Sequence, residues 1–171
     1  MKRVGALFLG LCVCTGGWAG TASKISWEIF EQRFESVKDG GDEPFHNPIS
    51  VKEIIPAIKN NPAKAGLKYG KPAVYVGQVK RVAVSNQTDA DLILDAGGGD
   101  EITVILFPQQ PHDWKKNEKG SWQFHDLEPT MEFAAKLDGG EQFYFQCKKF
   151  VAAFGKGYLN DCIAFPIKIF K

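Results

Sequence analysis

The sequence predicts a mainly β protein of the α+β class, built around a small five-stranded barrel. Three observations support this class. Residues 73–84, 91–95 and 101–107 have the alternating, Val- and Leu-rich pattern of strands. Residues 142–150 and 158–169 repeat that pattern near the C-terminus, and residues 129–137 between the two groups are rich in helix formers. The residues before 71 have helical spacing instead.

The N-terminus has the pattern of a secretory signal. Lys2 and Arg3 precede an apolar run at 4–13 and a small-residue stretch at 15–22. The run is well short of the ~20 residues that a membrane-spanning helix needs. We therefore expect cleavage after Ala22, which removes residues 1–22 and leaves no transmembrane segment.

A lipid anchor on Cys12 or Cys14 is the alternative to simple cleavage. Leu11 and Val13 stand immediately before these cysteines, where a bacterial lipoprotein signal has a small residue. Cleavage is therefore favoured, and the expected location is the periplasm of a Gram-negative bacterium or the exterior.

The mature chain is expected to be close to neutral. The whole chain has 21 basic and 20 acidic side chains, and removal of the signal takes away two basic residues and no acid. Nucleic-acid binding rests largely on phosphate neutralisation by Lys and Arg, so a nucleic acid is an unlikely partner.

Residues 23–70 predict a helical extension. Residues 23–37 have amphipathic helical spacing. Ser50 and Glu53 form a capping-box pattern at the start of a second helix, which continues to Ile58 through Pro56. A short helical turn follows at 62–67, with Pro62 suited to its first position.

Residues 71–171 predict the barrel. Three meander strands, a helix and a hairpin are the element order of an OB-fold, a five-stranded Greek-key barrel. Gly77 lies in the middle of the long first strand, where strong bending needs a bulge or a missing side chain. Residues 108–128 are polar and are expected to form a long exposed loop inserted after the third strand.

Cys147 and Cys162 are the only cysteines outside the signal, and an oxidising compartment favours their pairing. If Ala152 faces Gly157 in the last hairpin, Cys147 faces Cys162 within disulfide reach. We expect a structural disulfide across the last two strands. Two buried reduced thiols are the alternative, and a redox-catalytic pair would have closer spacing.

Residues 61–165 resemble the exported OB-fold family called tRNA_anti-like, most of whose members are uncharacterised bacterial proteins. The resemblance rests on four groups of residues: Asn61, Ala65, Lys68 and Tyr69; Gly70, Lys71, Pro72, Val74, Val76, Gly77 and Val79; Gly140, Phe143 and Phe145; and Leu159, Asp161 and Cys162. The chain departs from the family in the 108–128 insertion and at Gln146, where a glycine is more usual. The resemblance implies the fold, and it does not establish RNA binding.

Two places are candidate binding surfaces. Trp114 and Trp122, with Lys115 and Lys116 between them, are typical of an aromatic and basic patch for an anionic strand or glycan, or else of tryptophans that pin the insertion to the barrel. Phe154 at the tip of the last hairpin either anchors a partner or folds down to cap the barrel. The OB-fold commonly binds ligands near this loop and the loop at 85–90.

Catalysis and metal binding are less favoured. His112 and Asp113, and His125 and Asp126, are weak metal-ligand candidates that exhaust the histidines together with His46. No phosphate loop, nucleophile elbow or helical zinc-protease motif occurs in the sequence. We predict no enzymatic activity and no cofactor.

These observations together predict a non-enzymatic periplasmic module that contacts a protein or cell-envelope component. The alternatives are an OB-type binder of single-stranded nucleic acid or oligosaccharide, and a metal-dependent enzyme. Ligand identity and oligomeric state do not follow from the sequence.

Overall fold

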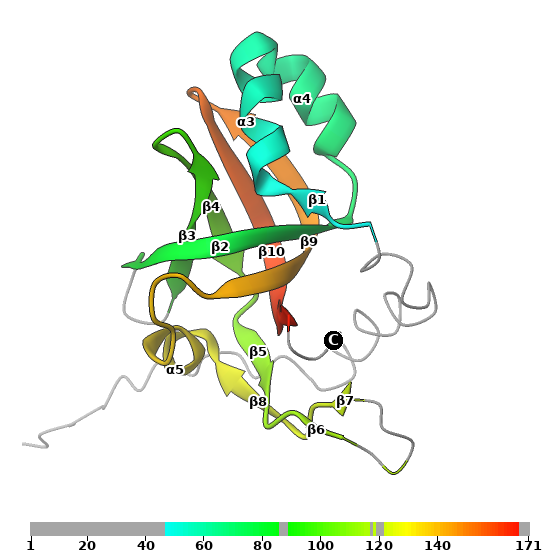
Figure 1. The fold of residues 1–171 in the computed structure, drawn as a ribbon, viewed down its shortest axis with the longest axis vertical. Helices are drawn as coiled ribbons and strands as arrows, with labels where there is room; N and C mark the ends of the chain where they lie inside the picture. The colour runs from blue at the N-terminus through cyan, green and yellow to red at the C-terminus, as the bar shows by residue number, and fades with distance from the viewer. Residues whose placement is uncertain (1–46, 86–88, 117, 119–121, 168–171) are drawn as a thin grey trace, which may run out of the picture.

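The computed structural model describes residues 47–85, 89–116, 118 and 122–167. The expected signal at 1–22, the helix expected at 23–37 and His46 lie outside these residues. The mainly β class is confirmed: a six-stranded sheet dominates the described chain, with two helices at one end and one helix at the other (Figure 1).

Strand order in the main sheet is β1, β2, β3, β4, β10, β9, with an additional pairing of β2 with β9. The strands are β1 (Ile49–Ser50), β2 (Ala73–Val84), β3 (Ala90–Gly97), β4 (Asp100–Leu106), β9 (Gln142–Ala153) and β10 (Lys156–Pro166). β10 runs parallel to β4 and β1 runs parallel to β2, and the other pairings are antiparallel. Each of β2, β3, β4, β10 and β9 therefore pairs with two others of the five.

β2 serves two neighbours because it bends. Its first half pairs with β9 and its second half pairs with β3, and the pairing with β3 shifts between Val79 and Arg81. Gly77 lies just before this bulge. A Cβ atom at Gly77 would lie 2.7 Å from Leu94 Cδ1 and 3.0 Å from Val51 Cγ2. The strand bends near Gly77 as expected, and the glycine also lets α3 approach the strand closely, which the sequence did not predict.

α3 (Val51–Asn60) and α4 (Pro62–Tyr69) form the predicted helical extension, and the short turn expected at 62–67 is a complete helix. The Ser50 side chain caps α3, but it accepts a hydrogen bond from Lys52 N at 3.3 Å and not from Glu53 N. Pro56 does not end the helix, which continues to Asn60. Asn61 caps α4 by accepting from Lys64 N, and Pro62 occupies the first turn.

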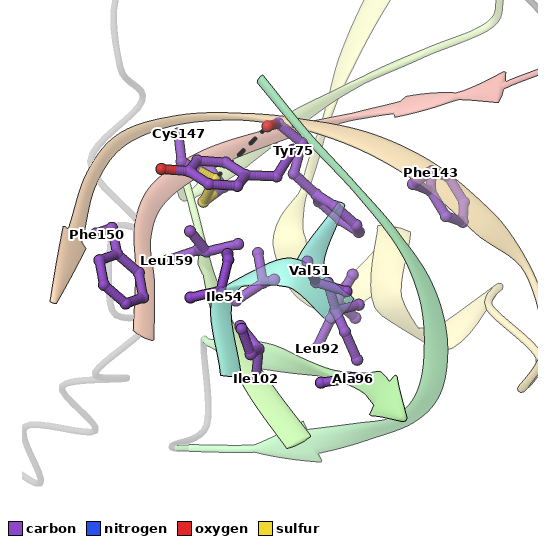
Figure 2. Packing of buried hydrophobic residues seen from close by; sticks show 14 of the residues in the cluster. Val51, Ile54, Tyr75, Leu92, Ala96, Ile102, Phe143, Cys147, Phe150 and Leu159 are labelled. Carbon is purple, nitrogen blue, oxygen red and sulfur yellow. Dashed lines mark hydrogen bonds between the residues drawn. A yellow bond between two sulfur atoms is a disulfide. The ribbon is translucent and has the colours of Figure 1, made fainter. Parts of the chain in front are cut away.

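α3 is part of the hydrophobic core and not an addition to its surface. Its residues Val51, Ile54, Ile55 and Ile58 are buried. Figure 2 shows Val51 and Ile54 among side chains of the sheet, which include Leu92, Ile102 and Leu159. Removing α3 would expose this apolar area to water, so the sheet and α3 form one folding unit.

The predicted disulfide is confirmed. Cys147 and Cys162 are bonded, with their Cα atoms 4.1 Å apart. Ala152 faces Gly157 and Cys147 faces Cys162, as predicted. In an antiparallel hairpin without a register shift, each step back along one strand is matched by one step forward along the other, so the first pair determines the second.

The prediction of an exposed loop at 108–128 is wrong at the base of the insertion. β5 (Gln109–His112) pairs with β8 (Asp126–Pro129), and β6 (Lys115–Lys116) pairs with β7 (Trp122–Gln123). The insertion is therefore a two-stranded ribbon, and its residues Gln110 and Glu128 are buried. α5 (Thr130–Ala135) follows it and is shorter than the helix expected at 129–137. None of the helices in the described ranges combines the length and apolar character that a bilayer crossing requires.

Candidate functional site

A cleft of about 530 Å³ lies where the ribbon and α5 meet the ends of β9 and β10. The ribbon and α5 lie at the end of the molecule opposite α3 and α4 (Figure 1). The apolar residues that line it are Pro111, Trp114, Phe133, Leu137, Phe143 and Pro166. The polar residues are His112, Asp113, Glu128 and Lys136. The cleft is thus mostly apolar, with a few charged groups.

Gln110 holds the base of the ribbon against β10. Its side chain is fully buried, and its amide nitrogen donates hydrogen bonds to the carbonyls of Phe107 at 2.8 Å and Cys162 at 3.1 Å. Its amide oxygen accepts from Ala164 N at 2.8 Å. One side chain therefore satisfies Ala164 N and adds a second donor to the Cys162 carbonyl, which also accepts from Phe107 N, and it holds one wall of the cleft against β10.

The ribbon also covers a second apolar cluster. Phe107, Ile163 and Phe165 form this cluster, and Trp114, Phe124, Leu127 and Tyr144 pack against it. The Trp114 ring lies 5.5 Å from that of Phe124 and 6.0 Å from that of Phe165. Trp114 thus pins the ribbon to the sheet, which is one of the two roles considered for the tryptophans. Its indole nitrogen is buried and has no hydrogen-bond partner in the described part of the chain.

Glu128 and Lys136 form an ion pair at the cleft. The Glu128 side chain is 6% exposed and the Lys136 side chain is 62% exposed. Burying a carboxylate without a partner is costly, and Lys136 supplies a partner for Glu128. The pair adds charged groups to the otherwise largely apolar lining of the cleft.

Three of the four histidine and aspartate candidates, His112, Asp113 and Asp126, have a side-chain partner within 4 Å. His112 faces Asp126 across β5 and β8, with 3.5 Å between Nε2 and Oδ2. Asp113 lies 2.6 Å from Lys115 Nζ, and this lysine, with smaller contributions from His125 and His112, lowers the pKa of the Asp113 carboxyl. Within the described ranges, no three His, Cys, Asp or Glu side chains gather in a way that could hold a metal ion.

The expected aromatic and basic patch is only partly assembled. Trp114 faces the sheet, whereas Lys115 and Lys116 are exposed on β6. The backbone of Trp122 pairs with Lys116 across β6 and β7. The side chain of Trp122 lies outside what the structure describes.

Phe154 lies at the other end of the molecule, at the turn between β9 and β10. It is 99% exposed, so the expectation that it folds down to cap the sheet is wrong. The turn places it outward because Phe154 has φ 52° and Gly155 has φ 73°. Phe154 therefore does not belong to the cleft.

Several cleft residues had no signal in the sequence. Glu128 lies on β8, Lys136 at the end of α5 and Phe143 on β9, so only the tertiary fold brings them together. Gln110 resembles any polar residue of an exposed loop. Phe133 and Leu137 are four residues apart and so lie on one face of the predicted helix. Their spacing was the one indication in the sequence that this helix buries an apolar face.

Comparisons with protein-family models and with curated proteins found no match to this chain.

Proposed function

We propose that this protein is an exported, non-enzymatic binding module with an OB-fold barrel, which contacts a protein or cell-envelope component in the periplasm. The observation that carries the proposal is the cleft of about 530 Å³ between the ribbon, α5 and the sheet. Its volume lies in the range of roughly 300–1,000 Å³ that is usual for ligand sites.

The strand pairings support an OB-fold. Barrel strands one to five correspond to β2, β3, β4, β9 and β10, and α5 lies between the third and the fourth. The pairings of β2 with β9 and of β4 with β10 in parallel are those that such a barrel needs to close. We also propose that the chain is related to the tRNA_anti-like family, on the residues that resemble it.

The walls of the cleft support binding because they are held in place before any partner arrives. Gln110 bonds the ribbon to β10, and Trp114 packs against Phe165. A preformed site loses little conformational entropy on binding. Apolar walls with one ion pair suit a partner that inserts an apolar side chain and orients it through a polar neighbour.

A protein or envelope partner is favoured over a nucleic acid by the charges on β2 and β4. Lys80 and Arg81 both bind Glu101, at 2.8 and 3.0 Å. The hydrogen bond from Lys80 is the largest cause that lowers the pKa of Glu101. Glu101 thus offsets one of these two positive charges, which weakens the attraction of this region for an anionic strand.

Site-specific photo-crosslinking in periplasm tests the proposal. A photo-reactive residue replaces His112, which lines the cleft and is one-third exposed. The matched control carries the same residue at Val84, which is 64% exposed at the end of β2 and does not line the cleft. We expect a discrete crosslinked product from position 112 that the Leu137→Glu substitution removes.

Equal products from both positions, or none from position 112, would contradict the cleft as the binding site. Two measurements address the alternatives. A steep salt dependence of single-stranded oligonucleotide binding would favour the nucleic-acid binder, and stoichiometric metal on the purified chain would favour a metal-dependent enzyme.

A further inference from the structure

The end of the molecule opposite the cleft carries the two most exposed large apolar side chains among the described residues. Phe154 is 99% exposed and Leu67 is 83% exposed. We call this end the cap surface and define it as residues 51–69, 97–100 and 148–161. It contains α3, α4, the β3–β4 turn and the β9–β10 turn, which lie together at the top of Figure 1.

Both side chains are held outward by the backbone. Phe154 and Gly155 both have positive φ in the two-residue turn between Ala153 and Lys156, and this conformation is unfavourable for a bulky residue. In α4, Ala65 and Tyr69 are buried, and Leu67 lies midway between them in sequence and so on the opposite side of the helix.

The cap surface is basic although the chain as a whole is near neutral. Its seven lysines are all exposed: Lys52, Lys59, Lys64, Lys68, Lys148, Lys149 and Lys156. Its three acids are Glu53, Asp100 and Asp161. By contrast, the described residues between 109 and 141, around the cleft, hold seven acids and three lysines. The charge is therefore polarised along the molecule.

Two of the acids already have lysine partners. Lys59 lies 2.7 Å from Asp100, and Lys148 lies 3.8 Å from Asp161. Lys156 pairs with Ala153 at the base of the turn that carries Phe154, and Lys149 pairs with Asn160 further along the same hairpin. The hairpin therefore places one lysine beside the projecting aromatic ring and a second lysine farther from it.

We propose that the cap surface docks on an anionic phospholipid bilayer, with Phe154 and Leu67 entering the interfacial region and the lysines contacting the headgroups. Stable peripheral binding needs an apolar signal and an electrostatic signal together. The two exposed apolar side chains and the seven exposed lysines of the cap surface provide both. A nucleic acid would use the lysines but would leave Leu67, which cannot stack on bases, without a role. Docking in this way leaves the cleft directed away from the bilayer.

Co-sedimentation of the mature chain with vesicles tests the proposal. We expect binding to vesicles of phosphatidylglycerol mixed with phosphatidylcholine, and little binding to phosphatidylcholine alone. Phe154→Ala should weaken binding about tenfold, since a buried aromatic ring contributes on that scale. Removal of Lys149 or Lys156 should weaken it about fivefold each.

The matched controls are Val84→Ala, an exposed apolar residue outside the cap surface, and Lys116→Ala on the ribbon. Both should bind like the unmodified chain. A Phe154→Trp variant adds an independent readout, because its fluorescence should shift to shorter wavelength with anionic vesicles only.

Two results would overturn the proposal. One is equal binding to neutral and anionic vesicles, or none to either, by a chain that is shown to be folded. The other is binding that depends on the lysines but not on Phe154 and that a single-stranded oligonucleotide displaces, which would indicate a polyanion site. Neither result affects crosslinking from position 112, so this inference and the proposed function fail separately.

Discussion

Gln110 shows how much one buried amide contributes to this structure. It makes three hydrogen bonds, to Phe107, Cys162 and Ala164, and water does not reach it. Leaving buried polar groups without partners costs about 1–3 kcal/mol each. The ribbon and the last strand are therefore coupled through one side chain.

Gln110→Leu tests this coupling. We expect a loss of about 1–3 kcal/mol in the free energy of unfolding, because Ala164 N loses its partner. The two carbonyls keep other donors, since Phe107 N bonds to Cys162 O and Thr130 Oγ1 bonds to Phe107 O. Denaturant unfolding measures the change. Gln142→Leu, on the exposed start of β9, is the control and should change stability by less than about 0.5 kcal/mol. Similar values for both variants would show that the buried amide is dispensable.

Tyr75 makes the unfolding free energy depend on alkaline pH. Burial is the main cause that raises the pKa of its hydroxyl from 10.0 to about 12. The hydroxyl also donates a hydrogen bond to the Tyr69 carbonyl at 2.9 Å. Above pH 10.0 the unfolded chain releases this proton while the folded chain retains it, so stability falls as pH rises toward 12.

Tyr75→Phe removes both the hydrogen bond and the titration. At neutral pH we expect a loss of about 1 kcal/mol relative to the unmodified chain. At about pH 11 the difference should shrink, because only the unmodified chain is then losing stability through this group. Unfolding curves at the two pH values measure it, and a constant difference would contradict the raised pKa.

At the scale of elements, Gly77 determines how closely α3 approaches β2. The space that a Cβ atom would need is already taken by Leu94 and Val51. Gly66 in α4 has no atom within 4 Å of the corresponding position. An alanine methyl group would therefore be crowded at Gly77 and would have open space at Gly66.

We predict opposite effects for the two substitutions. Gly77→Ala should destabilise the protein by about 1–3 kcal/mol through crowding. Gly66→Ala should stabilise it by about 0.5–1 kcal/mol, since alanine favours a helix interior. Thermal unfolding of both variants provides the measurement. Destabilisation by both would mean that α4 is constrained in a way that its open surroundings do not reveal.

The strands of the main sheet and the helices packed on it were predictable, because each has its own spacing of apolar residues within one short segment. The strand expected at 73–84 has those bounds, and the hairpin pairing followed from two cysteines and one turn. The ribbon was not predictable, because β5 and β8 have only four residues each and contain Pro111 and Pro129. Their stability comes from Gln110 and from Phe165, whose positions depend on the completed sheet.

The cleft was predictable only at one of its walls. Trp114 and His112 stood out as unusual residues in a polar segment, but Lys136 and Phe143 belong to other segments. A site formed by three distant segments has no spacing that a single sequence reveals. Phe154, in contrast, was recognisable as a turn residue, and what remained open was its direction.

The molecule as a whole depends on the bond between Cys147 and Cys162, which are fifteen positions apart. Replacing both with alanine should reduce the free energy of unfolding by about 2–4 kcal/mol, largely because the unfolded chain regains the entropy of an open loop. Denaturant unfolding of the double variant and of the reduced unmodified chain should give similar losses. A change below about 1 kcal/mol in both would show that the bond adds little to the packed sheet.

The two cysteines also sit beside a step in the hairpin. Buried residues on β9 alternate up to Cys147 and resume at Phe150, and those on β10 alternate up to Leu159 and resume at Cys162. In both strands, the residues that face the main core change from odd-numbered to even-numbered at this place. Ile163 and Phe165 therefore lie on the other face of β10, where they pack under the ribbon. A one-residue slip between these strands would turn buried side chains toward the wrong face along the whole hairpin. The sulfur link joins two residues that face each other in the observed register, so once it has formed it excludes that slip.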